Sequence, residues 1–173
     1  MAYEQHTQAA ERINANCAVV TLSDTRTFDT DTSGKRISEL LESDGHRIGG
    51  RWLIPDDPRQ LGELLDTIFR DGVDGAPVDA VITNGGTGIS QRDSTISVVE
   101  SRLTIPLPGF GELFRMLSYE QIKSGAMLSR ATGGVAGERQ LLFALPGSTK
   151  AVELAMTKLI LPEIRHLLGE LRK

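Results

Sequence analysis

Three short apolar segments, each followed by a polar loop and then a helical pattern, constrain the fold of this chain most strongly. The segments are CAVVTL (17–22), RIGGRWLIP (47–55) and VDAVIT (78–83). Short apolar runs of this kind are typical of strands buried on both faces. Strands that alternate with helices predict a three-layer α/β domain with a mostly parallel sheet, because parallel neighbours need a crossover connection.

The helical patterns between these segments support that interpretation. KRISELLESDG presents apolar residues on one face, and Gly45 is expected to follow its last turn. Pro58 suits the first turn of the next helix. The apolar residues of that helix recur at i, i+3, i+4, i+7 and i+8, and they are Leu61, Leu64, Leu65, Ile68 and Phe69.

The second half of the chain predicts further elements. We expect a helix from about residue 93 to about residue 100 and another over residues 110–122. Residues 131–145 read as a hairpin that turns at AGER, which would add at least one antiparallel strand and make the sheet mixed. The C-terminal helix should bend or restart at Pro162.

Length and charge bound the class of protein. The 173 residues fit a loose arm over residues 1–15 and one folded domain over residues 16–173. The only cysteine, Cys17, cannot form an internal disulfide. A formal net charge of −4 with mixed signs argues against nucleic acid as the main partner. A polar N-terminus and the lack of a long apolar run predict a cytoplasmic protein without a membrane partner.

Polar loops follow all three predicted strands. They are SDTRTFDTDTSG, the start of PDDPRQ, and NGGTGISQRD. Because ligands of parallel sheets bind beyond the carboxyl ends of the strands, all three loops should open on one edge. The glycines of NGGTG would let the backbone approach an anion closely, although a tight turn explains them equally well. Neither a P-loop nor a dinucleotide fingerprint is present.

Aspartates at two of these strand ends suggest a metal ion. Asp93 and Asp56, with Asp57 beside it, could each cap a helix. Carboxylates facing a glycine-rich anion seat would repel phosphate unless Mg²⁺ lay between them. That arrangement would indicate nucleotide chemistry at a phosphorus atom.

Five motifs in order resemble the MoaB/MogA family. They are SDTRTFDTDTSG, VITNGGTGISQRD, LPGFGELFRMLSYEQI, the SRA of residues 129–131, and LPGSTKA, and the resemblance runs from about residue 15 to about residue 161. It implies a three-layer α/β domain with a mixed sheet. It also implies a molybdopterin adenylyltransferase, which transfers AMP from Mg-ATP to the terminal phosphate of molybdopterin and releases pyrophosphate. Trimers or hexamers, and contacts with other molybdenum cofactor pathway proteins, are implied as well.

The resemblance also implies roles for residues. Asp56 and Asp93 would be catalytic and would hold Mg²⁺. Ligand contacts would come from the first loop on the pterin side, from the glycine loop around a phosphate, and from two later motifs on the nucleotide side. The residues concerned are Ser23, Asp24, Thr25, Ser33, Gly34, Gly85, Gly86, Thr87, Gly88, Pro108, Gly109, Glu112, Gly147 and Ser148.

The chain departs from the family pattern at two positions, and three other functions are compatible with the same fold. Asn84 stands where the family more often has Thr, Ser or Gly, and because asparagine tolerates turns we expect little effect. Thr149 replaces Pro and still permits a helix start. The alternatives are a non-catalytic molybdopterin carrier, a structural subunit, and a pyrophosphatase-like relative of competence-damage proteins. Arg130 and Lys150 could contact a phosphate or equally serve a subunit contact.

Overall fold

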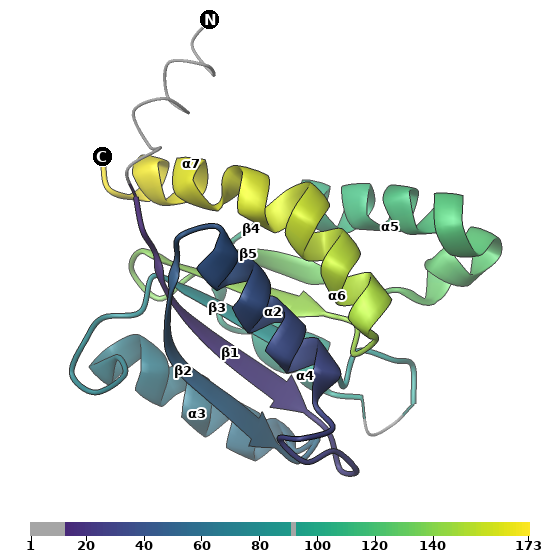
Figure 1. Ribbon diagram of the computed structural model, residues 1–173, viewed down its shortest axis with the longest axis horizontal. Helices are drawn as coiled ribbons and strands as arrows, with labels where there is room; N and C mark the ends of the chain where they lie inside the picture. Colours follow the sequence, from purple (N-terminus) through teal and green to yellow (C-terminus); the bar gives the residue numbers. More distant parts are fainter. Residues whose placement is uncertain (1–12, 91–92) are drawn as a thin grey trace, which may run out of the picture.

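The computed structural model of the chain describes residues 13–90 and 93–173 and shows one twisted sheet between two layers of helices (Figure 1). The sheet has six strands in the order β2-β1-β3-β6-β5-β4. Their bounds are β1 Asn16–Leu22, β2 Arg47–Ile54, β3 Ala80–Asn84, β4 Leu103–Pro106, β5 Thr132–Ala136 and β6 Gln140–Leu145. Strands β2, β1, β3 and β6 are parallel, whereas β5 pairs antiparallel with both β6 and β4. The mixed, mostly parallel sheet is confirmed.

Each face of the sheet is covered by its own group of helices (Figure 1). Helices α2, α5, α6 and α7 pack on one face, and α3 and α4 pack on the other. The bounds are α2 Thr32–Ser43, α3 Pro58–Asp71, α4 Thr95–Glu100, α5 Pro108–Ile122, α6 Thr149–Ala155 and α7 Leu161–Leu171. The short 3₁₀ segment η1, Lys123–Leu128, follows α5.

Alternation along β1 explains why both faces are apolar. Cys17 and Val19 point into the core under α2, while Ala18 and Val20 point into the core under α3. All four side chains are fully buried, as expected of a central strand in a three-layer fold. Burial also raises the pKa of the Cys17 thiol to about 12, with the charge of Asp79 adding to the effect, so the thiol stays protonated.

The C-terminal helix is interrupted where the sequence indicated. A π-helical turn, η2, spans Met156–Ile160 between α6 and α7. Pro162 lies in the first turn of α7. Because proline lacks an N–H and its ring crowds the carbonyl four residues earlier, the ladder widens before it.

Three boundaries differ from the sequence expectation. Strand β4, with four residues, and segment η1, with six, were not predicted, because such short elements show no clear periodicity. The folded part also begins before residue 16, since Ala15 is fully buried and its carbonyl accepts from the N–H of Arg47 at 2.9 Å. Residues 1–12 of the predicted arm lie outside the described residues.

Candidate functional site

The loops that follow β1, β2 and β3 meet at the carboxyl edge of the parallel strands, as predicted, and the loop after β6 joins them there. The N–H of Ser23 donates to the carbonyl of Ile54 at 2.9 Å, which joins the first loop to the end of β2. The N–H of Gly85 donates to the carbonyl of Leu145 at 3.1 Å, which joins the glycine loop to the end of β6. The register of neighbouring parallel strands therefore places four sequence motifs side by side.

The first two glycines of NGGTG are required by the backbone. Gly85 and Gly86 have φ angles of 96° and 61°, which L side chains rarely adopt. A Cβ on Gly85 would lie 2.2 Å from the carbonyl oxygen of Leu22, and a Cβ on Gly147 would lie 3.2 Å from the Cα of Gly85. The loop after β3 is thus pressed between the end of β1 and the LPGS turn, which leaves no room for side chains.

Three carboxylates lie beside this loop. The N–H of Asp56 donates to Oδ1 of Asp24 at 3.1 Å. Burial raises the pKa of Asp56 above its ordinary value, and the negative charges of Asp93 and Asp24 raise it further. Carboxyl groups that are distant in the chain therefore converge, as the sequence predicted for Asp56 and Asp93.

Buried oxygen atoms without partners mark the floor of the site. Among the described residues, Oδ1 of Asp56, Oγ1 of Thr95 and Oγ of Ser94 are buried and make no hydrogen bond. A Cβ on Gly86 would lie 2.3 Å from Oγ1 of Thr95 and 2.6 Å from Oδ1 of Asp56. Unsatisfied buried oxygens are rare in folded proteins, and a cluster of them is typical of a site that a ligand completes.

Of the aspartates that could cap a helix, Asp57 does so and Asp93 does not. Asp57 caps α3, since its Oδ1 accepts from the N–H groups of Arg59 at 2.8 Å and Gln60 at 3.1 Å. Asp93 does not cap α4, because Ser94 occupies the N-cap position. Instead, Oδ2 of Asp93 accepts from the N–H of Ser90 at 2.8 Å and leaves its carboxylate beside Gly88.

The donor set suits Mg²⁺ in kind and in number. Within residues 13–90 and 93–173 no group of three or more His, Cys, Asp or Glu side chains could hold a metal ion by itself. Mg²⁺ is commonly held by one or two carboxylates, and phosphate oxygens and water complete its shell. Asp56 and Asp93 provide two carboxylates, and the unpartnered Oδ1 of Asp56 provides an oxygen that a cation would satisfy.

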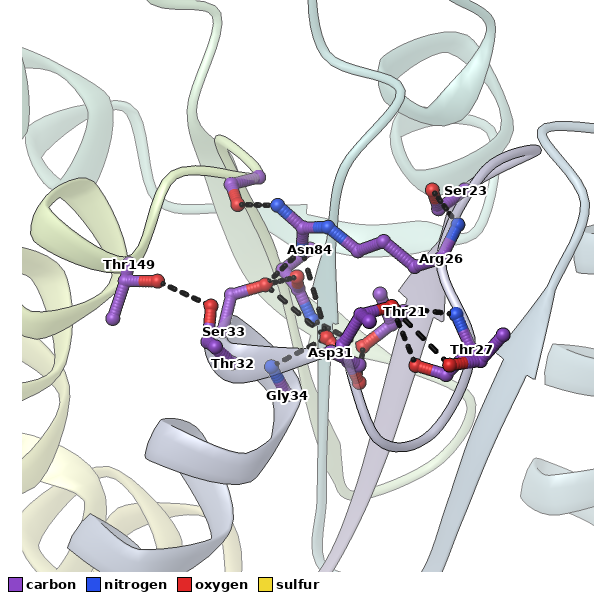
Figure 2. A network of polar contacts seen from close by, with 12 residues as sticks. Thr21, Ser23, Arg26, Thr27, Asp31, Thr32, Ser33, Gly34, Asn84 and Thr149 are labelled. Atoms are coloured by element: carbon purple, nitrogen blue, oxygen red, sulfur yellow. Dashed lines mark hydrogen bonds and ion pairs between the residues drawn. The ribbon is translucent and has the colours of Figure 1, made fainter.

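A relay of hydrogen bonds orders the first loop around the buried Asp31 (Figure 2). Arg26 donates to Oγ of Ser33, which donates to Oδ1 of Asn84 at 2.8 Å. Nδ2 of Asn84 donates to Oγ1 of Thr21 at 2.9 Å, and Thr21 donates to Oδ2 of Asp31 at 2.8 Å. The relay links the first loop, α2, β1 and β3 through polar groups that are all satisfied.

Asp31 stays ionised at the centre of this relay. Burial by itself would raise its pKa, but the guanidinium of Arg51, the N–H of Gly34 and the hydroxyl of Thr21 donate to its carboxylate and hold the pKa below its ordinary value. Nη2 of Arg51 is 2.7 Å from Oδ2, and Nη1 of Arg26 is 3.5 Å from Oδ1. Two guanidinium groups thus share one buried carboxylate.

The relay changes how two predicted site residues, Ser33 and Gly34, and the family departure at Asn84 are understood. Ser33 and Gly34 are buried, and a Cβ on Gly34 would lie 2.2 Å from Oδ2 of Asp31, so both residues support the first loop from beneath. Asn84 ends β3 and is fully buried with its amide bonded on both sides, so turn tolerance does not explain it. In the same loop Ser23 is half-buried, and Asp24 and Thr25 are exposed.

A cavity of about 600 Å³ opens between α4, the start of α5 and η1. Pro108 and Glu112 line it, as does Arg130, which also contacts the glycine loop. Gly109 lies outside this cavity and lines a separate groove toward α7, so the PGFGE motif divides between two surfaces. Ser148 caps α6 by accepting from the N–H of Ala151 at 3.3 Å.

Sequence reasoning missed three residues that this geometry singles out, Arg26, Asp31 and Thr95, and it left Arg130 open between a phosphate contact and a subunit contact. The sequence signal for each was weak, because each polar residue stands among others in a loop or at a helix start. Arg26 and Arg130 are distinguished only by partners from distant parts of the chain. Thr95 is distinguished by a buried hydroxyl that has no partner among the described residues.

Comparison with known proteins identifies the class that this fold and site define. The family model described as a probable molybdopterin binding domain matches residues 18–166. Molybdenum cofactor biosynthesis protein B of Bacillus cereus is 46% identical over 174 residues, which covers 100% of this chain and 99% of that protein. The protein of the same name from Bacillus subtilis is 45% identical with the same coverage.

Solved structures agree with these relatives. A crystal structure of molybdenum cofactor biosynthesis protein B has a TM-score of 0.86 and 46% identity, and the match covers 92% of this chain and 97% of that one. The tungsten cofactor synthesizing protein MoaB from Pyrococcus furiosus has a TM-score of 0.78 and 34% identity, with 92% and 98% covered. The chain therefore belongs to the MoaB/MogA family of molybdenum cofactor biosynthesis proteins, as its motifs indicated. Across the part of the chain that the structure describes, no helix could cross a membrane.

Proposed function

We propose that this protein is a molybdopterin adenylyltransferase, which transfers AMP from Mg-ATP to the terminal phosphate of molybdopterin and releases pyrophosphate. One observation carries the proposal. The carboxylate of Asp56, whose Oδ1 is buried and unpartnered among the described residues, faces Asp93 beside a glycine loop. Paired carboxylates beside an anion seat are useful when a cation and a phosphate bind together.

The bond changes need little covalent help from the protein. A lone pair on a terminal phosphate oxygen of molybdopterin would form the new bond to the α-phosphorus of ATP. The bond from that phosphorus to the oxygen bridging the β-phosphorus would break, and its electron pair would leave with pyrophosphate. The attacking phosphate is already ionised near neutral pH, so no general base is required.

The work left to the chain is to bring two anions together in line. The glycine loop gives close backbone approach at Gly85 and Gly86. Asp56 and Asp93 would hold Mg²⁺, which when bound neutralises phosphate charge and stabilises the leaving pyrophosphate. Alignment of two bound reactants can supply several kcal/mol by itself, on the order of 7 in favourable cases.

The cavity beside α5 suits the nucleoside part of ATP. It measures about 600 Å³, which is within the usual range for small-molecule sites. Ile96, Leu107 and Met127 give it apolar walls, and Glu112 and Arg130 place charged groups at its rim. Because Arg130 also contacts the glycine loop, a nucleotide could extend from this cavity toward the carboxylates.

A carrier that holds molybdopterin without transfer is the second candidate function, because it would use the same loops. The two functions differ in their need for ATP. Purified protein incubated with molybdopterin, ATP and Mg²⁺ should release pyrophosphate if it is the transferase. Isothermal titration should then show ATP binding that depends on Mg²⁺, whereas pterin binding without ATP binding would support the carrier.

We further propose that the protein acts as a homo-oligomer, as its family resemblance implies. Exposed apolar side chains recur every three residues along α5, at Leu113, Met116, Tyr119 and Ile122. Met127 of η1 is 80% exposed and Leu128 is 55% exposed. Large apolar side chains left this exposed on one helix and on the segment after it are typical of a surface covered by another subunit.

A further inference from the structure

The side chain of Arg130 bridges the two ends of the glycine loop by hydrogen bonds to backbone carbonyls of that loop. Nε of Arg130 donates to the carbonyl oxygen of Thr87 at 3.1 Å, and Nη2 donates to the carbonyl oxygen of Asp93 at 2.9 Å. Nη2 also donates to the carbonyl oxygen of Gly88. One guanidinium therefore accounts for three carbonyl groups on either side of residues 89–92.

The carbonyl of the preceding residue is also held by the protein. The N–H of Thr95 donates to the carbonyl oxygen of Gly86 at 3.2 Å. The carbonyls of Gly86, Thr87 and Gly88 are thus all engaged by donors. In contrast, the N–H groups of these three residues meet no acceptor within the described ranges.

The loop therefore offers hydrogen-bond donors to a ligand, but not acceptors. The carbonyls are engaged, whereas the N–H groups are left without acceptors in the stretch where Asp56 lies beside Gly86 and Asp93 lies beside Gly88. Consecutive backbone N–H groups without acceptors form a seat for an anion such as phosphate. The guanidinium suits the task, because its planar fork offers several donors in fixed directions, whereas a lysine offers one rotating ammonium group.

We infer that Arg130 is a positioning residue: it holds the carbonyls of the glycine loop and of Asp93, so that the N–H groups of the loop face a bound phosphate. The inference rests on the proposed function for the identity of the ligand, a nucleotide phosphate. It does not require Arg130 to touch the reacting atoms.

The test compares Arg130→Met and Arg130→Lys with the wild type. We expect both variants to bind Mg-ATP at least about tenfold more weakly in isothermal titration, because three charge-assisted hydrogen bonds cannot be replaced by one ammonium group. Arg115→Met is the matched control, since Arg115 lines the same cavity but donates to the carbonyl of Ser129, outside the glycine loop. It removes the same charge and should weaken binding less.

A second measurement needs no ligand. With glycine-selective ¹⁵N labelling, the amide resonances of Gly86 and Gly88 should shift or broaden in both Arg130 variants and stay unchanged in Arg115→Met. If Arg130→Met does not fold, Arg130→Lys supports the same comparison. Wild-type affinity in Arg130→Lys, equal weakening by Arg115→Met, or unchanged glycine resonances would each overturn the inference. If the wild type binds no ATP while the resonances respond as expected, the proposed function fails and the positioning role stands.

Discussion

Nη2 of Arg26, in the loop after β1, donates to the carbonyl oxygen of Gly147, in the turn after β6, at 2.9 Å. The two residues are 121 positions apart in the chain. Gly147 in turn packs against Gly85, so the arginine holds together the three loops that would enclose the ligand phosphates. Arg26 also forms an ion pair with the buried Asp31, which fixes the guanidinium from the opposite side (Figure 2).

Arg26→Met should loosen the Gly147 turn more than it affects the fold. We expect AMP transfer to fall about tenfold or more and the free energy of unfolding to fall by about 2 kcal/mol. The reason is that the substitution removes the hydrogen bonds of Arg26 to Gly147 and Ser33 and its ion pair with the buried Asp31. Pyrophosphate release and urea denaturation measure the two effects. Arg139→Met, in the exposed β5–β6 turn, is the matched control. Similar losses of transfer in the two variants would contradict the assigned role of Arg26.

Asp56 and Asp57 are adjacent but should behave differently. Asp56→Ala should abolish AMP transfer and leave the fold intact, because its carboxylate faces the site and makes no bond through Oδ1 to any described residue. Asp57→Ala should retain transfer and lose about 1 kcal/mol of stability, because it removes the N-cap of α3. Asp93→Ala should match Asp56→Ala in the pyrophosphate assay. Adenylylated pterin formed by Asp93→Ala at the wild-type rate would show that Asp93 does not hold the metal.

The raised pKa of Asp56 predicts a dependence on pH. A folded pKa above the unfolded value means that ionised Asp56 opposes folding, so its cost appears as the pH rises from the ordinary aspartate range through the raised value. Asp56→Asn lacks this cost and should have a higher melting temperature than the wild type at neutral pH in the absence of ligand. At low pH the two proteins should converge.

Binding of Mg²⁺ should show the opposite trend with pH. Only the ionised carboxylate binds the metal, so affinity should weaken on acidification at a higher pH than for an ordinary aspartate. Titration with Mn²⁺, followed by electron paramagnetic resonance, measures this directly. An affinity that stays constant until the ordinary aspartate range would show that Asp56 is not a ligand.

The exposed apolar side chains of α5 predict which surface joins the subunits. Met116→Glu and Ile122→Lys should reduce the mass measured by light scattering to that of a monomer, because a charge would be buried between subunits. Ile105→Lys changes an equally exposed apolar residue on the edge strand β4 and should leave the mass unchanged. If the wild type is itself monomeric, or if Ile105→Lys also dissociates the assembly, this surface is not the interface.

Local patterns account for most of the fold. The i, i+3, i+4 spacing of α3 and the apolar runs of β1 and β3 predicted these elements within a few residues. Pro162 predicted the interruption of the C-terminal helix. Strand β4 escaped prediction because its four residues depend on pairing with residues of β5 that lie 28 to 33 positions later.

The site was predictable only in part. Glycines and aspartates at strand ends predicted the edge of the sheet where the loops meet, because strand direction fixes where loops emerge. Which aspartate caps a helix, and which faces the site, depended on the N–H groups nearby, and these separated Asp57 from Asp56.

The sequence alone determined the class of fold, the site edge and the family, since these follow from periodicity and from residues close together in the chain. Tertiary structure alone decided the roles of Arg26, Asn84 and Arg130, each of which has a partner between 37 and 121 residues away. A polar side chain in a loop has many possible partners, and only the packed sheet and helices bring one set within hydrogen-bonding distance.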